Sequence, residues 1–381
     1  MEYISLLELN DIYNIIKKNT RNKDKLFKFE CCKNVNLYNI YNSLVNKTFV
    51  HGKYNIFLIY EPKARIIMSE NMSDRIVNYY VAEKILRPLL EPKLIDTNVA
   101  TRRGKGSLYG IIKLKKYINH MKLKYNNFYV LKCDIKKYFY SIDHNILINK
   151  LNKIIKDKNK LNLIINIINS TNYNYINNSI DKLIYKEINY IKNNNKLKDK
   201  DKKSRIKELE SIPKYTKGKG LPIGNVTSQV LAIFYLNDLD HYIKEKLSIK
   251  CYIRYMDDFL LIHQNKEYLK ECLNKIKSYL IKENLYLNNK TEIYSIYNSI
   301  NFLGYRFKLN SKKKLLQLMT NKHKRNINNM LKNKVDKYYY LYSHYRGYYK
   351  YCNNKSFIYK YLSISKYLSK IHKKWVWFST F

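Results

Sequence analysis

The clearest hydrophobic pattern in this chain frames two acidic residues. Residues 252–262 read Tyr-Ile-Arg-Tyr-Met-Asp-Asp-Phe-Leu-Leu-Ile, so apolar and aromatic runs lie on both sides of Asp257 and Asp258. This pattern predicts a β-hairpin whose tight turn lies at Tyr-Met-Asp-Asp. Both arms are apolar enough to be buried, and the turn would then hold two carboxylates on a rigid support. Aspartate is also a common turn residue for local reasons, so the pair alone does not establish chemistry.

Three other segments have the alternation or the apolar continuity of strands, namely residues 53–69, 128–135 and 300–307. The first predicts a hairpin that carries Lys63 and Arg65. The second ends on a carboxylate, Asp134, and leads into a helix. The third contains a lone glycine, Gly304, which indicates close approach of another backbone.

Most of the remaining chain has helical periodicity. The spacing predicts helices in residues 1–50, 72–85, 145–210, 230–246 and 312–381, a further helix that begins at about Leu108, and another that follows the Asp257–Asp258 hairpin and ends at about Asn284. Either Ser73 or Asp74 would cap the second of these. Residues 188–208 consist almost entirely of Lys, Asn and Asp, and we expect this stretch to be exposed and disordered.

The formal charge of +43, from 73 Lys and Arg against 30 Asp and Glu, favours a polyanionic partner, with nucleic acid first. The abundance of Lys, Asn, Ile and Tyr is typical of A/T-rich coding, so part of this charge reflects composition alone. Rare residues are therefore informative. Five of the 11 Arg fall between Arg65 and Arg103, and three of nine Gly lie in residues 213–224.

Two glycine-containing loops combine these rare residues. Residues 101–107 read Thr-Arg-Arg-Gly-Lys-Gly-Ser before a helix, so Arg102, Arg103 and Lys105 could meet phosphates, although such loops are often only solvated connections. Residues 218–229 read Gly-Lys-Gly-Leu-Pro-Ile-Gly-Asn-Val-Thr-Ser-Gln and also enter a helix. A loop of this kind allows backbone to approach a nucleotide closely.

The six cysteines show no zinc-type spacing, which suits a reducing cytoplasm. The N-terminus lacks the basic start and apolar run of a signal peptide. No apolar stretch has the length needed to span a bilayer. We therefore expect a cytoplasmic protein that does not enter a membrane.

The order of several features along the chain resembles that of a reverse transcriptase. These features are Asp134 at a strand end, the Gly220–Gln229 loop, the Tyr255–Asp258 hairpin, Lys290 and the Phe302–Tyr305 strand. The resemblance covers residues 53–310. It implies an α+β right-hand polymerase fold with an antiparallel palm sheet, packed helices and a C-terminal helical thumb. The implied domains are an N-terminal helical extension (1–52), fingers and palm (53–310) with an insertion near 150–215, and the thumb (311–381).

The resemblance implies an RNA-directed DNA polymerase, a nucleotidyltransferase that uses two divalent ions, Mg²⁺ with Mn²⁺ as an alternative. Asp134 and Asp257 would bridge the ions, Asp258 would support them, and the carbonyl oxygen of Ile135 would add a ligand. Lys63 and Arg65 match residues that grip the triphosphate, and Lys290 matches one that meets the pyrophosphate. Phe139 lies where a bulky aromatic blocks the 2′-hydroxyl, which favours dNTPs.

Within that family, Leu-Pro-Ile-Gly-Asn-Val-Thr-Ser-Gln is similar to the reverse transcriptases of diversity-generating retroelements, with Ile223 and Gln229 as the variant positions beside Gly224. Residues 343–353 also resemble the thumb of that group. The resemblance implies misincorporation opposite template adenines, because Ile223 cannot hydrogen-bond near the templating pair. Residues expected to contact nucleic acid are Arg75, Arg102, Arg103, Lys105, Arg254, Tyr255, Met256 and Gly304.

Such enzymes work with a template RNA, the cDNA or primer, dNTPs and a small basic accessory protein that is oligomeric. No maturase or endonuclease segment follows, which disfavours a group II intron enzyme. A retron-like or phage-defence polymerase is the main alternative. A non-catalytic RNA-binding scaffold is a further alternative, although it would have no use for Asp134, Asp257 and Asp258 together.

Overall fold

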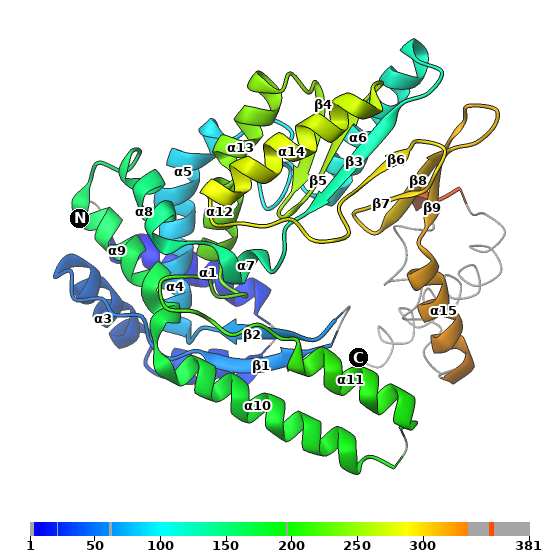
Figure 1. Cartoon of the computed structure of the whole chain (residues 1–381). Coiled ribbons are helices and arrows are strands. Elements are labelled where there is room, and N and C mark those ends of the chain that lie inside the picture. Colours follow the sequence, from blue (N-terminus) through cyan, green and yellow to red (C-terminus); the bar gives the residue numbers. More distant parts are fainter. Residues whose placement is uncertain (1–3, 21, 61–62, 196, 334–349, 354–381) are drawn as a thin grey trace, which may run out of the picture. The chain divides into compact units, whose positions relative to one another are not determined.

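The computed structural model describes residues 4–20, 22–60, 63–195, 197–333 and 350–353, and these form two compact units (Figure 1). The first unit contains Met1–Arg103, Ile135–Lys246 and Lys275–Asn289. The second contains Gly104–Asp134, Leu247–Asn274 and Lys290–Phe381. Each unit is therefore built from segments that are distant in the sequence. The consecutive domains expected at 1–52, 53–310 and 311–381 stay a prediction.

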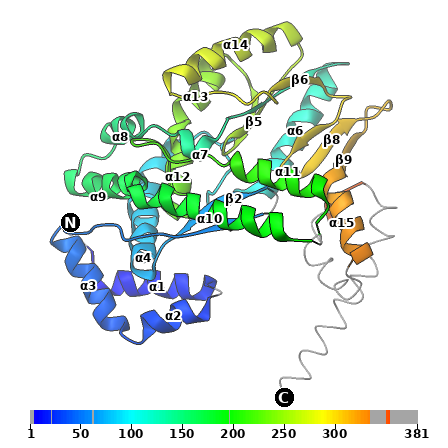
Figure 2. The same ribbon diagram turned by 60° about the horizontal axis from the view of Figure 1, so that its bottom comes forward.

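The first unit begins with three helices, α1 (Leu6–Asn19), α2 (Lys23–Glu30) and α3 (Lys33–Val45), seen together in Figure 2. A capping box starts α1, because the Ser5 hydroxyl accepts from the Glu8 backbone and the Glu8 carboxylate accepts from the Ser5 backbone. The buried face of α1 packs toward α3 and the next helix, α4 (Met72–Tyr80). The helical prediction for this segment is confirmed.

A two-stranded antiparallel hairpin, β1 (Asn55–Ile59) and β2 (Arg65–Ser69), precedes α4, as predicted. The cap expected at Ser73 or Asp74 is wrong. Asn71 caps α4, and its side chain accepts from the Asp74 backbone at 2.8 Å. Asparagine at this position satisfies an otherwise unpaired N–H group of the first turn. The helix continues as a π-helical turn, Val81–Leu86, and then as α5 (Arg87–Leu90).

The other helices of this unit follow Asp134. They are α7 (Tyr138–Ser141), α8 (His144–Asn152), α9 (Lys158–Ile168), α10 (Asn174–Asn193), α11 (Asp199–Glu210), α12 (Val226–Tyr235) and α13 (Asn237–His241). The disorder expected at 188–208 is wrong, since α10 and α11 cover most of it. Ile191 of α10 and Leu209 of α11 are buried and anchor these otherwise polar helices. The helix expected from Val230 begins earlier and is broken after Tyr235.

The second unit has at its centre a four-stranded antiparallel sheet in the order β4-β5-β3-β6. Its strands are β3 (Tyr129–Asp134), β4 (Cys251–Tyr255), β5 (Asp258–His263) and β6 (Glu292–Ser295). Helix α6 (Ser107–Lys124) packs against β4 and β5. The predicted strand ending on Asp134 and the predicted hairpin are both confirmed. Helix α14 (Lys266–Lys282) follows β5 and continues into the first unit.

A three-stranded sheet, β7 (Ile300–Phe302), β8 (Tyr305–Leu309) and β9 (Leu315–Met319), completes the second unit with α15 (Asn321–Asn333). Two expectations are corrected here. Leu303 and Gly304 both have positive φ, so they form a hairpin turn where a continuous strand was expected. Residues 315–319 pair with β8 instead of forming a helix. Most of the expected thumb lies outside the described residues. Among the described residues, no helix is both long and apolar enough to cross a membrane.

Candidate polymerase active site

The β4–β5 hairpin holds its acidic turn tightly. The last cross-strand pair is Tyr255 with Asp258, which leaves Met256 and Asp257 as the turn residues. Met256 has φ +57, the left-handed conformation that such two-residue turns require. Arg254 is fully buried, and its guanidinium donates to the Met256 carbonyl oxygen at 2.9 Å. Arg254 was expected to contact nucleic acid, but its burial gives it a place beneath the turn instead.

The sheet register brings a third carboxylate to this turn. Asp134, the last residue of β3, pairs directly with Asp258, the first residue of β5. Directly opposed residues of an antiparallel pair present their side chains on the same face, with Cβ atoms about 5 Å apart. Asp257 adjoins Asp258 in the turn. The structure therefore gathers Asp134, Asp257 and Asp258 at one end of one sheet.

Lys132 holds one of these carboxylates. Its Nζ lies 3.2 Å from Oδ2 of Asp258 and also donates to the carbonyl oxygen of Asn301, on β7, at 2.6 Å. The other oxygen of Asp258, Oδ1, is buried without a hydrogen-bond partner. Burial raises the pKa of Asp258 to about 6 against the opposing effect of Lys132, and the nearby Asp134 and Asp257 raise it further.

In the first unit, the glycine-rich loop packs on strand β2. The Met68 backbone donates to the Ile223 carbonyl at 2.9 Å, and a Cβ added to Gly224 would lie 2.7 Å from the Met68 carbonyl oxygen. Only glycine permits this approach, since φ of Gly224 is +138. The Phe139 carbonyl accepts from the Leu221 backbone at 2.7 Å. The structure thus joins the region of Phe139 to the loop that carries Ile223 and Gly224.

A pocket of about 290 Å³ opens beside this loop. Three of its lining residues, Arg75, Gly224 and Gln229, were predicted to bind nucleotide or nucleic acid. The others were not predicted and are Phe57, Ile67, Ser69, Glu70, Tyr79 and Val226. Strand alternation could have indicated part of this set, because Ile67 and Ser69 are two residues apart on β2 and share one face.

A buried cluster of ionisable side chains, which includes Glu70, was also not predicted from the sequence. His51, Glu70 and Asp74 are each about one-twentieth exposed or less, and the His51 Nδ1 atom lies 3.7 Å from the Asp74 carboxylate. Burial is the largest cause of the raised pKa values of Glu70 and Asp74. His51 is distant from Glu70 and Asp74 in the sequence, so no local pattern indicated this grouping.

Comparison with known proteins identifies the family. Residues 59–307, which contain Asp134, Asp257, Asp258 and the glycine-rich loop, match the family described as reverse transcriptase (RNA-dependent DNA polymerase). The chain belongs to the reverse transcriptase family. Membership agrees with the observed α+β architecture of antiparallel sheets and packed helices, the right-hand polymerase fold.

Individual relatives of this reverse transcriptase are distant. It is 28% identical over 231 residues to the putative COX1/OXI3 intron 2 protein of Saccharomyces cerevisiae, which covers 55% of this chain. The chain spans about a quarter, 26%, of that relative. A solved telomerase from Candida albicans, in complex with a fragment of telomeric RNA, is 16% identical with a TM-score of 0.44. The match covers 72% of this chain and 46% of that one.

A second solved telomerase, the apo enzyme of Candida tropicalis truncated from its C-terminal domain, is also 16% identical, with a TM-score of 0.42. That match covers 70% of this chain and 55% of the telomerase chain.

Reverse transcriptases generally use divalent metal ions, and the donors at the turn suit a hard cation. They are carboxylate oxygens without cysteine or histidine, and the buried Oδ1 of Asp258 lacks a partner. The described residues nevertheless contain no group of three acidic, histidine or cysteine side chains already arranged around a metal position. Ile135, expected to add a carbonyl ligand, follows Asp134 in the chain, belongs to the first unit and forms a β-bridge with Leu287.

The remaining predicted residues of this reverse transcriptase are divided between the two units. Lys63 and Arg65 are exposed at the tip of the β1–β2 hairpin. Arg75 donates to the Thr20 hydroxyl at 3.1 Å. Lys290 lies just before β6, and Gly304 lies in the β7–β8 turn.

Some of the cationic side chains of the basic loop at residues 101–107 make contacts within the protein. Arg102 donates to the carbonyl oxygens of Ile95 and Asn98 at 2.8 and 2.9 Å, so this side chain stabilises the loop. Arg103 pairs with Glu83 and is 82% exposed, which leaves it accessible to phosphate. Lys105 lies over the ring of Tyr109.

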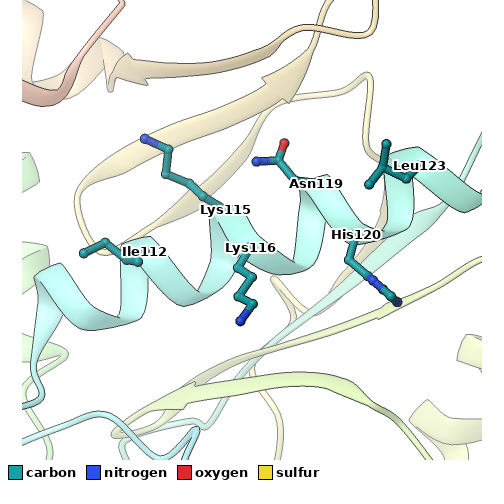
Figure 3. A pocket seen from close by; sticks show the side chains of 6 residues that line it. All are labelled: Ile112, Lys115, Lys116, Asn119, His120 and Leu123. Atoms are coloured by element: carbon teal, nitrogen blue, oxygen red, sulfur yellow. The ribbon is translucent and has the colours of Figure 1, made fainter.

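A shallow groove of about 530 Å³ along α6 was not predicted. Figure 3 shows its lining side chains, Ile112, Lys115, Lys116, Asn119, His120 and Leu123. All six project from one helix, and that helix contains no acidic residue. A single basic helix face of this kind is a common solvated surface, so the groove adds no assigned site.

Proposed function

We propose that this reverse transcriptase copies RNA into DNA at the carboxylate cluster of its second unit. The observation that carries the proposal is the pairing of Asp134 with Asp258 beside the Asp257 turn, within the segment that matches the family. Asp134 and Asp257 would hold two divalent ions, Mg²⁺ or alternatively Mn²⁺, with the Ile135 carbonyl as a further ligand. When bound, such ions activate the primer 3′-oxygen and stabilise the leaving pyrophosphate.

Asp258 has a supporting role in this proposal. Its Oδ2 atom is engaged by Lys132, which leaves the partnerless Oδ1 atom to face added positive charge. The triphosphate of a dNTP would meet Lys63, Arg65 and Lys290, and Phe139 would exclude a 2′-hydroxyl. The hydrogen bond between Phe139 and Leu221 supports a link between sugar selection and the glycine-rich loop. Tyr255, Met256 and Gly304 would contact the primer, with Arg103 and Lys105 contacting phosphates.

We further propose that the enzyme is of the diversity-generating type and makes errors opposite template adenines. The support is the Ile223 and Gln229 variant of the loop motif. The Ile223 backbone is fixed by Met68, and its partly exposed side chain has no hydrogen-bonding group. Geometry at the templating pair would then be enforced less strictly than with glutamine at this position. Template RNA, an accessory protein and a cytoplasmic setting belong to the same proposal.

Primer extension tests the catalytic part. The full chain is incubated with RNA template, DNA primer, dNTPs and Mg²⁺, and Asp257→Ala is compared with Asp11→Ala, a change at an exposed position of α1. We expect extension by wild type and Asp11→Ala and a loss of at least about 100-fold in Asp257→Ala. Equal extension by the two variants would refute the assignment.

Sequencing the products tests the error-prone part separately. We expect substitutions concentrated opposite template adenines, and fewer of them in Ile223→Gln. An even error spectrum, or one that Ile223→Gln leaves unchanged, would favour the alternative of a retron-like or phage-defence polymerase. Adding a small basic accessory protein encoded beside the gene should raise the yield without changing which template base is miscopied.

A further inference from the structure

The helices inserted between Asp134 and the glycine-rich loop pack against the hairpin that carries Lys63 and Arg65. One buried cluster contains Tyr54, Ile66 and Met68 from the hairpin region and Ile176 and Ile180 from α10. The Tyr54 backbone also donates to the Tyr175 hydroxyl at 2.9 Å. Figure 2 shows α10 running alongside this hairpin. Apolar packing therefore fixes the base of the hairpin on α10.

The same helix supports the glycine-rich loop. The Asn177 side chain both accepts from the Tyr215 backbone N–H at 3.0 Å and donates to the Tyr215 carbonyl at 2.8 Å. The Tyr215 hydroxyl donates to the Leu221 carbonyl at 3.2 Å. A Cβ on Gly220 would lie 2.8 Å from the Tyr215 ring, so the loop rests against that ring. Two groups of expected nucleotide-binding residues thus share one support.

Helix α11 reaches the tip of the hairpin. The Glu208 carboxylate accepts a hydrogen bond from the Ala64 backbone N–H at 3.0 Å. Ala64 is the residue between Lys63 and Arg65. The pKa of the neighbouring Tyr60 is raised, first by burial, then by the Glu187 carboxylate, and more weakly by Glu208. Both insertion helices therefore place carboxylates close to the hairpin tip.

The hydrogen bond made by Glu208 leaves the side chains of Lys63 and Arg65 available to bind a ligand. Its hydrogen bond is made to the backbone between them, and no ion pair among the described residues uses the side chain of Lys63 or of Arg65. A charged acceptor strengthens a backbone hydrogen bond beyond that of a neutral one. Its negative charge also offsets the repulsion between two cations that are two residues apart. The backbone at Ala64 is held while the side chains of Lys63 and Arg65 stay exposed.

We propose that Glu208 is a positioning residue, and that the α10–α11 pair braces the β1–β2 tip so that Lys63 and Arg65 are aligned for a nucleoside triphosphate before it binds. This inference rests on the proposed polymerase function and assigns a role to the inserted helices. Alignment before binding lowers the ordering cost of binding, so the effect of Glu208 should appear in nucleotide affinity more than in the chemical step.

Steady-state kinetics with three variants tests the role. Glu208→Ala removes the acceptor, Glu208→Gln keeps a carbonyl acceptor without charge, and Glu210→Ala is the matched control, an exposed glutamate at the same helix end. We expect Glu208→Ala to raise the KM for dNTP about 3- to 10-fold with kcat within about 2-fold of wild type. Glu208→Gln should recover part of the loss, because it keeps the acceptor but not the charge. Equal KM values for Glu208→Ala and Glu210→Ala, or no recovery with glutamine, would overturn the proposal.

Amide hydrogen exchange on the full chain provides a readout that needs no catalysis. Peptides covering residues 60–68 should exchange faster in Glu208→Ala and at the wild-type rate in Glu210→Ala, because the Ala64 N–H loses its acceptor only in the first. Unchanged exchange in Glu208→Ala would refute the brace even in an active enzyme. If wild type extends no primer while exchange responds as expected, the polymerase assignment fails and the brace itself stands.

Discussion

Lys132 and Asp258 form an ion pair across two neighbouring strands of the four-stranded sheet, with Nζ 3.2 Å from Oδ2. The two side chains are 22% and 28% exposed, so water screens the pair only in part. Because Lys132 also donates to the Asn301 carbonyl, one ammonium group ties the acidic turn to strand β7. This arrangement fixes the position of a carboxylate that would otherwise be repelled by Asp134 and Asp257.

Replacing Lys132 should therefore impair catalysis through Asp258. We expect Lys132→Met to slow extension about 10-fold, and Lys132→Arg to recover part of that rate. Lys312→Met, at an exposed lysine in the turn before β9, is the control and should extend at the wild-type rate. A double-mutant cycle with Asp258→Asn measures the coupling. Additive effects of Lys132→Met and Asp258→Asn would show that the lysine does not act through Asp258.

The raised pKa of Asp258 predicts that its charge destabilises the fold. Its folded-state pKa is about 6, above the ordinary aspartate value of 3.8, so the folded protein binds this proton more tightly. The resulting stability is complete below about pH 4 and is lost as the pH rises through 6. Asp258→Asn should thus raise the free energy of unfolding by up to about 3 kcal/mol at pH 8 and leave it nearly unchanged at pH 4.

Denaturant titrations at the two pH values measure this difference. Asp11→Asn, at an exposed position of α1, should change stability little at either pH. A gain of the same size at pH 4 and pH 8 in Asp258→Asn would mean that packing, and not the charge, explains the effect. Asp258→Asn is at the same time expected to extend primers more slowly, as is common for residues retained for function.

The sequence was sufficient for those parts of the site whose signal is local. Two buried runs around Asp257 and Asp258 predicted the hairpin and its turn, and an apolar run ending at Asp134 predicted the third strand end. The register that pairs Asp134 with Asp258, and the contact from Lys132, depend on long-range strand pairing. Periodicity within a single strand carries no information about that pairing.

The errors also have physical causes. The polar average composition of residues 188–208 predicted disorder where α11 forms. The helix is stabilised by its one buried residue, Leu209, and by the acidic residues of its first turn. The run 315–319 is short and apolar, a length at which strand and helix patterns cannot be separated. Gly304 was read as a close contact within a strand, whereas positive φ at two successive residues makes a turn there.

Gly224 provides a test of the contact between the glycine-rich loop and β2. Gly224→Ala would place Cβ 2.7 Å from the Met68 carbonyl oxygen, so the loop must move away from β2. Gly218→Ala is the control, because Gly218 also has positive φ, +76, but has nothing within 4 Å of the added Cβ. We expect a stability loss of about 1 to 2 kcal/mol in Gly218→Ala from backbone strain alone.

Gly224→Ala should lose more stability than the control and should reduce single-nucleotide incorporation at least about 10-fold, since the Ile223 and Met68 hydrogen bond is disturbed. Urea denaturation and single-turnover incorporation measure the two effects. If Gly224→Ala and Gly218→Ala behave alike in both assays, the close packing of the loop on β2 has no part in nucleotide binding.

Divalent metal should stabilise the second unit without being needed for its fold. The strands and the turn are held by their own hydrogen bonds and by Arg254, whereas three neighbouring carboxylates and the partnerless Oδ1 of Asp258 favour a bound cation. Chelation should therefore abolish extension while leaving the far-ultraviolet circular dichroism unchanged. Adding Mg²⁺ should raise the melting temperature of wild type in proportion to the occupancy of the site, and raise that of Asp257→Asn less. Loss of secondary structure on chelation, or the same Mg²⁺-induced rise in both proteins, would contradict a metal held at this turn.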